Sequence, residues 1–307
     1  MKRYLSPLIL LTASVIWGLA FSAQKAASAV PPLTLGAIRS IIATLFLLLL
    51  LPLSNRICHT GTDLSVKCSI RFTMRELLGG AILGAILAGA SFLQQAGIAA
   101  GADASKSSFI TSLYVVLVPI YALVLRKRAR LNVWISVAIA VVGFYFMCID
   151  GDFSISSAEL TVLLCSLVFP LHILFIDYFA PSTNGIRIAI VQFAAAAVIS
   201  AMPALIFESP IEADVIYESA LPLLYLGVMS SGIAYTLQII GQRGADPTAS
   251  ALILSLESVF GMLGAMVLLG EWLSTREYIG CATVFIAVIL SQINFKRKDG
   301  KNAEICK

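Results

Sequence analysis

Hydrophobic residues fall into long runs, separated by short polar breaks, along nearly the whole chain. A helix needs about 20 mostly apolar residues to cross the roughly 30 Å of hydrocarbon in a bilayer. Lipid also requires the backbone to satisfy its own hydrogen bonds, which a helix does. The pattern therefore predicts an all-α membrane protein with ten transmembrane helices. These runs are 6–29, 34–53, 76–99, 104–125, 131–149, 157–178, 185–206, 219–242, 247–269 and 276–295.

Composition supports the same class. Of the 307 residues, 59% are hydrophobic and only 12% are charged, against roughly 25% charged in a soluble domain. Charged residues are too few to cover a globular surface of this size, which excludes a soluble domain. The lipid bilayer is therefore the expected partner. The net charge of +4 is small, and the bases are concentrated at the ends of the apolar runs rather than on one helix face, so we expect no nucleic-acid partner.

The basic residues predict the orientation. With both termini in the cytoplasm, all but four of the 21 Lys and Arg residues fall on the cytoplasmic side, as the positive-inside rule requires. The exceptions are Lys25, Arg39, Lys106 and Arg276. We expect a multi-pass protein of the cell (cytoplasmic, or inner) membrane with cytoplasmic N- and C-termini.

The chain contains an internal repeat. When the sequence is shifted by 143 residues, segment 84–113 aligns with 227–256 and ten of 30 positions are identical. The matches include polar residues and the run Gly101-Ala102-Asp103, which aligns with Gly244-Ala245-Asp246. The third and fourth predicted helices therefore correspond to the eighth and ninth.

This correspondence divides the chain into two five-helix halves, residues 1–149 and 150–307, the second ending in a short basic cytoplasmic tail. Five crossings are an odd number, so the second half is predicted to be inverted relative to the first. Inverted repeats recur in secondary transporters, where the substrate site lies near the midplane between the halves.

Several motifs resemble the drug/metabolite transporter superfamily, EamA type. They are the segments 109–119 (Phe109 to Pro119) and 251–260 (Ala251 to Phe260), Leu269-Gly270-Glu271, Trp17-Gly18 and Leu237-Gln238. The resemblance covers about residues 6–295. It implies a ten-helix permease with a central cavity that exports or imports small metabolites such as amino acids.

One position departs from the pattern of this family. A proline usually follows the glutamate of the ninth helix, but here Ser258 follows Glu257. The kink that this proline would produce is therefore not predicted by the sequence.

Glu257 is the only carboxylate well inside a predicted helix. Placing an ionisable group there costs roughly 2.5–3.5 kcal/mol on insertion scales, so it should face a cavity or a partner. It could contact a substrate ammonium group or couple transport to protons. It could equally be a structural acid paired with a base or tyrosine. Its counterpart in the repeat is Tyr114.

Two bases near the outer side are candidates for binding an anionic substrate group. Lys106 could bind a carboxylate, or be an interfacial base that extends its charge to water. Arg39 could neutralise an anionic substrate, although a structural salt bridge with Glu257 or an outer-loop acid is the favoured interpretation.

His172 could relay protons, or bond a backbone carbonyl freed by Pro170. The remaining candidates to line a substrate cavity are amides and aromatic residues, which more often serve packing: Trp17, Tyr235, Gln95 and Gln238.

We find no Walker, HExxH or GxSxG motif, and the six cysteines form no CxxC pair. No enzyme activity, cofactor or metal is therefore expected. A GxxxG spacing at 80–84 indicates helix packing and leaves a homodimer open.

Together these features predict a secondary active transporter that moves a small polar metabolite, an amino acid or similar, by alternating access. Glu257, Tyr114, Lys106 and Trp17 are expected to contribute to its site, and export is the favoured direction. Two alternatives stay open. The first is a multidrug or organic-cation exporter, although the first helix lacks a carboxylate. The second is a membrane receptor or assembly protein that does not transport.

Overall fold

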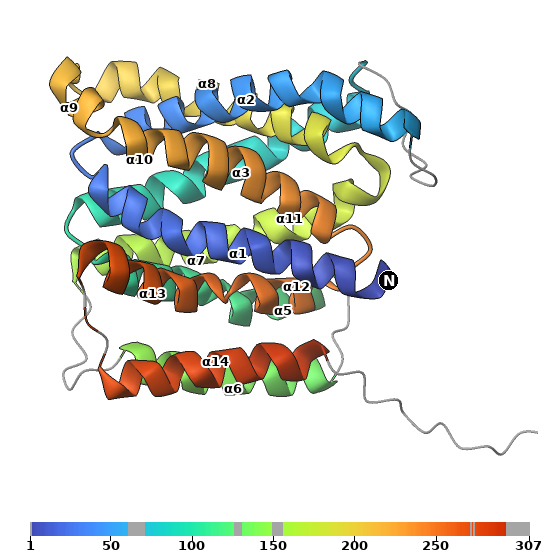
Figure 1. Cartoon of the computed structure of the whole chain (residues 1–307), viewed down its shortest axis with the longest axis vertical. Coiled ribbons are helices and arrows are strands. Elements are labelled where there is room, and N and C mark those ends of the chain that lie inside the picture. Colours follow the sequence, from blue (N-terminus) through green and yellow to red (C-terminus); the bar gives the residue numbers. More distant parts are fainter. Residues whose placement is uncertain are drawn as a thin grey trace, which may run out of the picture.

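The computed structural model describes residues 2–60, 71–125, 131–148 and 156–292, apart from 271 and 273. Within these ranges the chain is helical, with short turns and no strand (Figure 1). Four features of the sequence lie outside the described residues: the Asp150-Gly151-Asp152 break, Glu271, and the basic segments 126–130 and 293–307.

The helices follow the predicted apolar runs. Those up to residue 148 are α1 (Lys2–Ala26), α2 (Pro32–Thr60), α3 (Met74–Ala99), α4 (Ala104–Ser112), α5 (Tyr114–Val124) and α6 (Leu131–Cys148). Those from residue 157 are α7 (Ser157–Phe179), the 3₁₀ turn η1 (Ala180–Ser182), α8 (Gly185–Phe207), α9 (Ala213–Glu218), α10 (Ala220–Leu224), the π-helix η2 (Tyr225–Ala234), α11 (Tyr235–Gly241), α12 (Pro247–Leu254), α13 (Glu257–Leu269) and α14 (Thr275–Gln292).

Among the described residues, eight helical segments are long and apolar enough to cross a membrane. The fifth and tenth predicted runs form shorter apolar helices, Leu131–Phe146 and Tyr278–Ser291. The prediction of an all-helical, multi-pass membrane protein is confirmed. The count of ten crossings stays a prediction.

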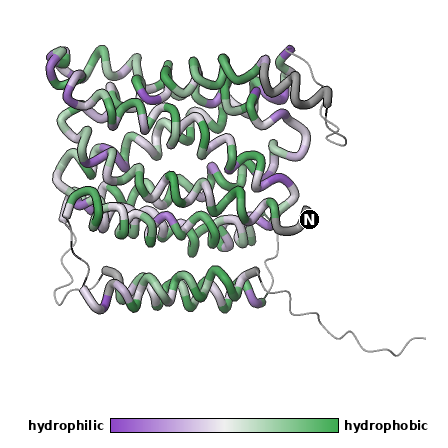
Figure 2. The backbone as a smooth tube through the Cα atoms, viewed as in Figure 1, coloured by the Kyte–Doolittle hydropathy of each residue, from purple (hydrophilic) through white to green (hydrophobic). Residues whose placement is uncertain are grey.

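The outer surface of the bundle is apolar. Large side chains such as Leu49, Leu205 and Phe207 are 78%, 87% and 79% exposed. Figure 2 shows hydrophobic residues along the helices, with hydrophilic residues concentrated toward their ends. Such extensive apolar exposure marks a surface that is covered by something other than water, here lipid.

Three of the predicted spans contain irregular turns that the apolar pattern does not predict. Span 104–125 breaks at Leu113, between α4 and α5, and span 247–269 breaks at Ser255-Leu256, between α12 and α13. Within span 219–242, the segment Tyr225–Ala234 is a π-helix. Such irregular turns occur often at functional sites.

Serine side chains explain the break before Glu257, which occurs without the proline typical of the family. Ser255 Oγ donates to the Leu252 carbonyl at 2.9 Å, and Ser258 Oγ donates to the Ser255 carbonyl at 2.7 Å. The Leu256 amide bonds Ile253, three residues back, at 3.2 Å. Serine hydroxyls that bond nearby carbonyls offer the backbone an alternative to the helical ladder and often bend helices.

The repeated segments share local structure. Gly101 and Gly244 both have positive φ, +115° and +74°, in the turns that precede α4 and α12. The two helix breaks also fall at corresponding positions of the repeat and touch each other. Ser112 Oγ donates to the carbonyl of Ser255, its counterpart in the repeat, at 3.4 Å.

The helices form a broad bundle in which α2 packs beside α8 at one edge and α6 beside α14 at the opposite edge (Figure 1). Between these edges, α1 contacts η2, α4, α11, α12 and α13, while α3 contacts α7 and α8. Because α1 touches both broken helices, it borders the centre of the molecule.

Glycines bring α3 and α8 close together. A Cβ at Gly80 would lie 2.5 Å from Val191 Cβ, and one at Gly84 would lie 2.4 Å from the Gln192 carbonyl oxygen. The GxxxG spacing at 80–84 therefore serves packing inside the bundle, as small residues do in membrane helices.

A buried carboxylate covers the N-terminus of α8. Glu76 Oε1 accepts hydrogen bonds from the Asn184 amide at 2.9 Å and from Arg187 Nη2 at 2.8 Å. The Glu76 and Arg187 side chains are only 1% and 4% exposed. Its other oxygen accepts the Thr73 amide at 2.9 Å in a capping box. Charge, helix dipole and backbone donors together compensate the buried ions.

A second carboxylate covers the N-terminus of α2, at the other end of the bundle. The half-buried Glu208 accepts hydrogen bonds from the Leu33 and Thr34 amides and from Thr34 Oγ1, each at 2.7 Å. At each end of the bundle, therefore, a carboxylate from one segment accepts hydrogen bonds from the first turn of a helix that is distant in the sequence.

The close α3–α8 contact predicts that replacing two different glycines of α3 by alanine changes stability by different amounts. Gly84→Ala should destabilise the protein by about 1–3 kcal/mol, because the nearest atom is backbone and cannot move aside easily. Gly89→Ala should be neutral or stabilising by up to about 1 kcal/mol, because nothing lies within 4 Å of its Cβ position. Thermal unfolding of the purified variants in detergent measures both. Equal destabilisation would contradict this packing.

The buried ion pair makes a second prediction. Arg187→Met should destabilise the protein by about 3–5 kcal/mol, because it leaves the Glu76 carboxylate buried without its base. The double variant with Glu76→Gln should cost clearly less than the sum of the single variants. As a control, Lys106→Gln breaks a partly exposed pair and should cost at most about 1 kcal/mol. Additive effects at Glu76 and Arg187, measured by denaturant unfolding, would argue against the pair.

Candidate functional site

A small polar cavity lies in the interior, between the broken helices, α1, α2, α7 and the π-helix. Its lining includes Trp17, Arg39, Gln94, His172 and Glu257, which are contributed by both parts of the repeat. The space open to the centres of water molecules is about 40 Å³. One water needs roughly 10–15 Å³ by that measure, so the cavity has room for about three waters in this conformation.

The two helix breaks place Glu257 and Tyr114 at the cavity. Each is the first residue of the helix that follows its break, α13 and α5 respectively. Glu257 is 5% exposed, and the Tyr114 and Ser112 hydroxyls are its electrostatic neighbours. Its position in the first turn of α13 also favours a negative charge. The Tyr114 hydroxyl is buried and interacts with Glu257, but it makes no hydrogen bond of good geometry to any described residue.

Arg39 is buried on the α2 side of the cavity, where it is 6% exposed. Nε donates to Ser231 Oγ at 2.9 Å and Nη2 donates to Ser230 Oγ at 3.1 Å. In the part of the chain that the structure describes, no carboxylate lies within 4.0 Å of this guanidinium. The salt bridge that the sequence favoured is therefore replaced by two serines of the π-helix.

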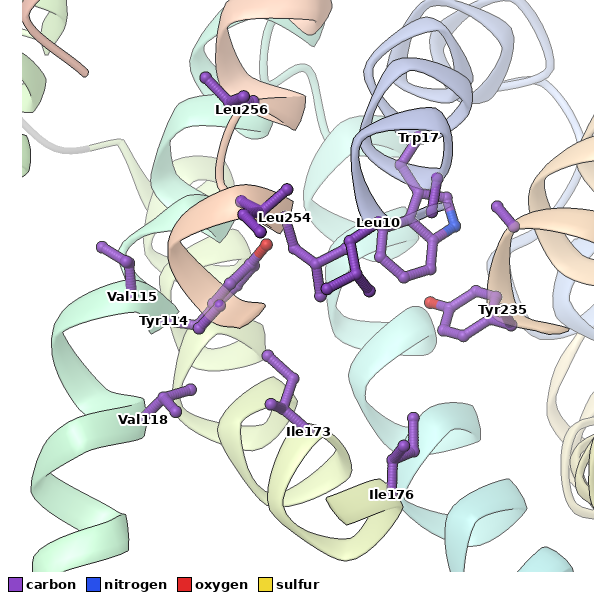
Figure 3. Packing of buried hydrophobic residues seen from close by; sticks show 14 of the residues in the cluster. Leu10, Trp17, Tyr114, Val115, Val118, Ile173, Ile176, Tyr235, Leu254 and Leu256 are labelled. Atoms are coloured by element: carbon purple, nitrogen blue, oxygen red, sulfur yellow. The ribbon is translucent and has the colours of Figure 1, made fainter. Parts of the chain in front are cut away.

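Trp17 and Tyr235 form an aromatic wall. Their ring centroids are 4.6 Å apart with an interplanar angle of 57°, and Figure 3 shows the two rings next to each other. Trp17 Nε1 donates to the Ser230 carbonyl of the π-helix at 3.2 Å. The His172 ring packs edge-on against Tyr235 at 5.6 Å. Aromatic faces of this kind can stack on a substrate or attract a cation.

His172 has a different partner from the one predicted. Its Nε2 lies 3.2 Å from Gln192 Oε1, so an amide of α8 takes the place of a carbonyl freed by Pro170. Gln192 is fully buried, and its Nε2 lacks a partner among the described residues. The Gln192 Nε2 group, beside the histidine, can therefore still donate hydrogen bonds.

The glutamines divide between the cavity and the packing around it. Gln238 lines the cavity, and so does Gln94, which donates to Thr111 Oγ1 at 3.0 Å. Gln95 is not part of the lining and donates to the Gln24 carbonyl at 3.3 Å. The repeat singled out Gln95, whereas its neighbour Gln94 reaches the cavity. Thr111 and Ser230 also line the cavity, and no local signal in the sequence indicates them.

Lys106 lies away from the cavity. Its side chain is 52% exposed, and Nζ is 3.5 Å from Glu159 Oε1 at the start of α7. Of the predicted site residues, the structure therefore gathers seven around the cavity and places two outside its lining. The seven are Trp17, Arg39, Tyr114, His172, Tyr235, Gln238 and Glu257; the two are Lys106 and Gln95.

The fold and this site define a multi-pass helical membrane protein with a buried polar cavity. The chain belongs to the EamA-like transporter family, whose sequence model matches it twice, over residues 5–149 and 156–292. It is thus a membrane transporter by family.

The chain is also similar to two proteins described as uncharacterized transporters. One, from Archaeoglobus fulgidus, is 30% identical over 294 residues, covering 94% of this chain and 86% of that protein. The other, from Methanothermobacter thermautotrophicus, is 22% identical over 308 residues, covering 96% and 88%. A crystal structure with 19% identity shares the fold, with a TM-score of 0.71 over 93% of this chain and 96% of that one.

The Tyr114 hydroxyl makes a prediction about the site. Tyr114→Phe should change the free energy of unfolding by less than about 0.5 kcal/mol, because the hydroxyl has only a poorly aligned interaction with Glu257 to lose. Tyr225→Phe should cost about 0.5–1.5 kcal/mol, because Tyr225 Oη donates to the Ile16 carbonyl at 2.9 Å. Thermal unfolding in detergent compares the two. A larger loss for Tyr114→Phe would mean that its hydroxyl supports the fold.

Proposed function

We propose that the protein is a secondary active transporter that moves a small polar metabolite across the cell membrane by alternating access. The observation that carries this proposal is the polar cavity at the helix breaks, which Glu257 lines together with residues from both parts of the chain. Discontinuous helices around a central site are a recurrent feature of secondary transporters.

The proposed architecture is two inverted halves, residues 1–149 and 150–307, which rock about this cavity. Three observations support it: the aligned Gly-Ala-Asp turns, the helix breaks at corresponding positions, and the two separate matches to the family. Because each half would hold five crossings, the second would be inverted. Two similar halves in opposite orientations give states of similar energy that open to opposite sides.

The size of the cavity fits a closed intermediate of such a cycle. A volume of about 40 Å³ holds water but no metabolite of amino-acid size. Substrate entry therefore requires the halves to separate at one end of the bundle. The acid contacts at Glu76 and Glu208 are among the polar contacts that join the two halves at those ends in the present conformation.

Within this proposal Glu257 binds a substrate ammonium group or exchanges a proton with it, and the favoured direction is export. A carboxylate held in a low-dielectric interior suits either role. The driving force is then the gradient of the substrate itself or of protons.

Two other functions fit the site less well. An organic-cation exporter would have to accommodate the buried Arg39 charge in its own cavity, which repels a cation. A receptor or assembly protein without transport has no use for an interior polar cavity, and a dry interface between the halves would suit it better.

Counterflow in proteoliposomes tests the proposal. Wild-type protein, offered a labelled mixture of amino acids and small metabolites, should exchange at least one solute. Glu257→Gln should reduce that exchange at least about tenfold, because losing one charge-assisted contact costs roughly 1.5–3 kcal/mol. Should Glu257 serve proton coupling alone, the variant should keep exchange and lose acceleration by a pH gradient.

The matched control is Glu218→Gln, which removes an exposed carboxylate at the end of α9 and should leave exchange unchanged. If folded wild-type protein exchanges none of the solutes offered, the transport proposal loses its support. If Glu257→Gln behaves as wild type in exchange and in its response to pH, the site lies elsewhere.

A further inference from the structure

Arg39 is a buried cation whose charge lacks a protein counter-ion within the described residues. It is 6% exposed, its two hydrogen-bond partners are neutral serines, and no acid lies within 4.0 Å. Removing an ion from water costs several kcal/mol unless a partner compensates. In membrane proteins such uncompensated charges mark substrate or ion pathways.

The serines leave part of the guanidinium available. Nε and Nη2 point along one edge of the planar group, and this edge is taken by Ser231 and Ser230. The other edge, formed by Nη1 and the second N–H of Nη2, makes no hydrogen bond within the described residues, and Arg39 borders the cavity. Two parallel N–H groups of this kind match the two oxygens of a carboxylate.

The π-helix orients this edge. Two consecutive residues of η2, Ser230 and Ser231, both reach Arg39, so the guanidinium is held from one side and cannot turn freely. The carbonyl of Ser230 also accepts the Trp17 indole N–H. The irregular helix thereby places the cation and the aromatic wall in fixed relation to each other.

The acid of the cavity stands apart from this cation. Tyr235 interacts electrostatically with both Arg39 and Glu257, whereas these two residues are not an ion pair. The cavity thus has a basic wall at Arg39 and an acidic wall at Glu257, with the Trp17–Tyr235 rings bordering it. A solute that carries an acidic group and a cationic group would satisfy both walls.

We propose that Arg39 is the carboxylate-binding residue of the site and that the substrate is a carboxylic acid held through its two oxygens. The proposal rests on the transport function proposed above and assigns its substrate class. A phosphate ester is disfavoured, because a dianion calls for more positive charge and Arg39 is the only Arg or Lys among the described residues that line the cavity.

Ligand-dependent thermal stability of the full-length protein in detergent tests this without requiring transport. The probes are an equimolar pool of the common amino acids with short mono- and dicarboxylic acids, a matched pool of their carboxamides, and inorganic phosphate. The acid pool should raise the melting temperature of wild-type protein, because ligands that bind only the folded state stabilise it. Carboxamides and phosphate should not.

With Arg39→Gln, the acid concentration that gives the same rise in melting temperature should be about tenfold to a hundredfold higher, because the two charge-assisted hydrogen bonds of the guanidinium are lost. Arg39→Lys keeps the charge without this pair of hydrogen bonds and should fall between. The control Arg75→Gln removes an exposed arginine of α3 and should bind as wild type. Should Arg39→Gln fail to fold, the lysine variant and the acid-against-amide comparison in wild-type protein still decide the question.

The proposal is overturned if carboxamides or phosphate stabilise the wild type as well as acids do, if no acid stabilises it, or if Arg39→Gln retains the full response. Counterflow separates this failure from that of the function. Exchange of carboxamides that Arg39→Gln leaves intact would uphold transport and refute the carboxylate site. Binding of acids that depends on Arg39, without exchange of any solute, would uphold the carboxylate site and refute the transport function.

Discussion

Lipid offers no hydrogen bonds to a broken helix, so every interruption in this bundle must be satisfied from within the protein. The breaks before Tyr114 and Glu257 meet that requirement with serines and i→i−3 amides. They also lie against each other, shielded from lipid by α1 and α7. Polar side chains gather beside these irregular segments, and there the cavity forms.

The two copies of the repeat place different side chains around the cavity, although their backbones correspond. The breaks correspond in the repeat, yet one begins its helix with a tyrosine and the other with a glutamate. The π-helix and its serines accompany only the second copy, and they hold Arg39 of the first. A repeated backbone therefore supplies the geometry, while differences between the copies supply the charge pattern that a particular solute would recognise.

Long-range hydrophobic pattern was enough to predict the helices and the membrane, because span length is set by the bilayer itself. The repeat also brought Tyr114 and Glu257 together as counterparts. The breaks were not predictable, since Ser255 and Ser258 act through bonds to carbonyls three residues back, which leave no trace in hydropathy. Which of Gln94 and Gln95 lines the cavity depends on the rotation of α3 about its axis, which the sequence does not give. The placement of Lys106 outside the cavity depends on its ion pair with Glu159 on another helix.

The two acids that cover helix N-termini differ in their relation to solvent. Around Glu208, water can replace each backbone donor as soon as the contact opens, because the residue is only half-buried. The Glu76–Arg187 pair is dry, so its separation requires water to enter first and hydrate two ions. In the alternating-access cycle proposed above, entry of water rather than contact strength would then limit how fast that end of the bundle opens, and solutes that lower water activity should slow that opening selectively.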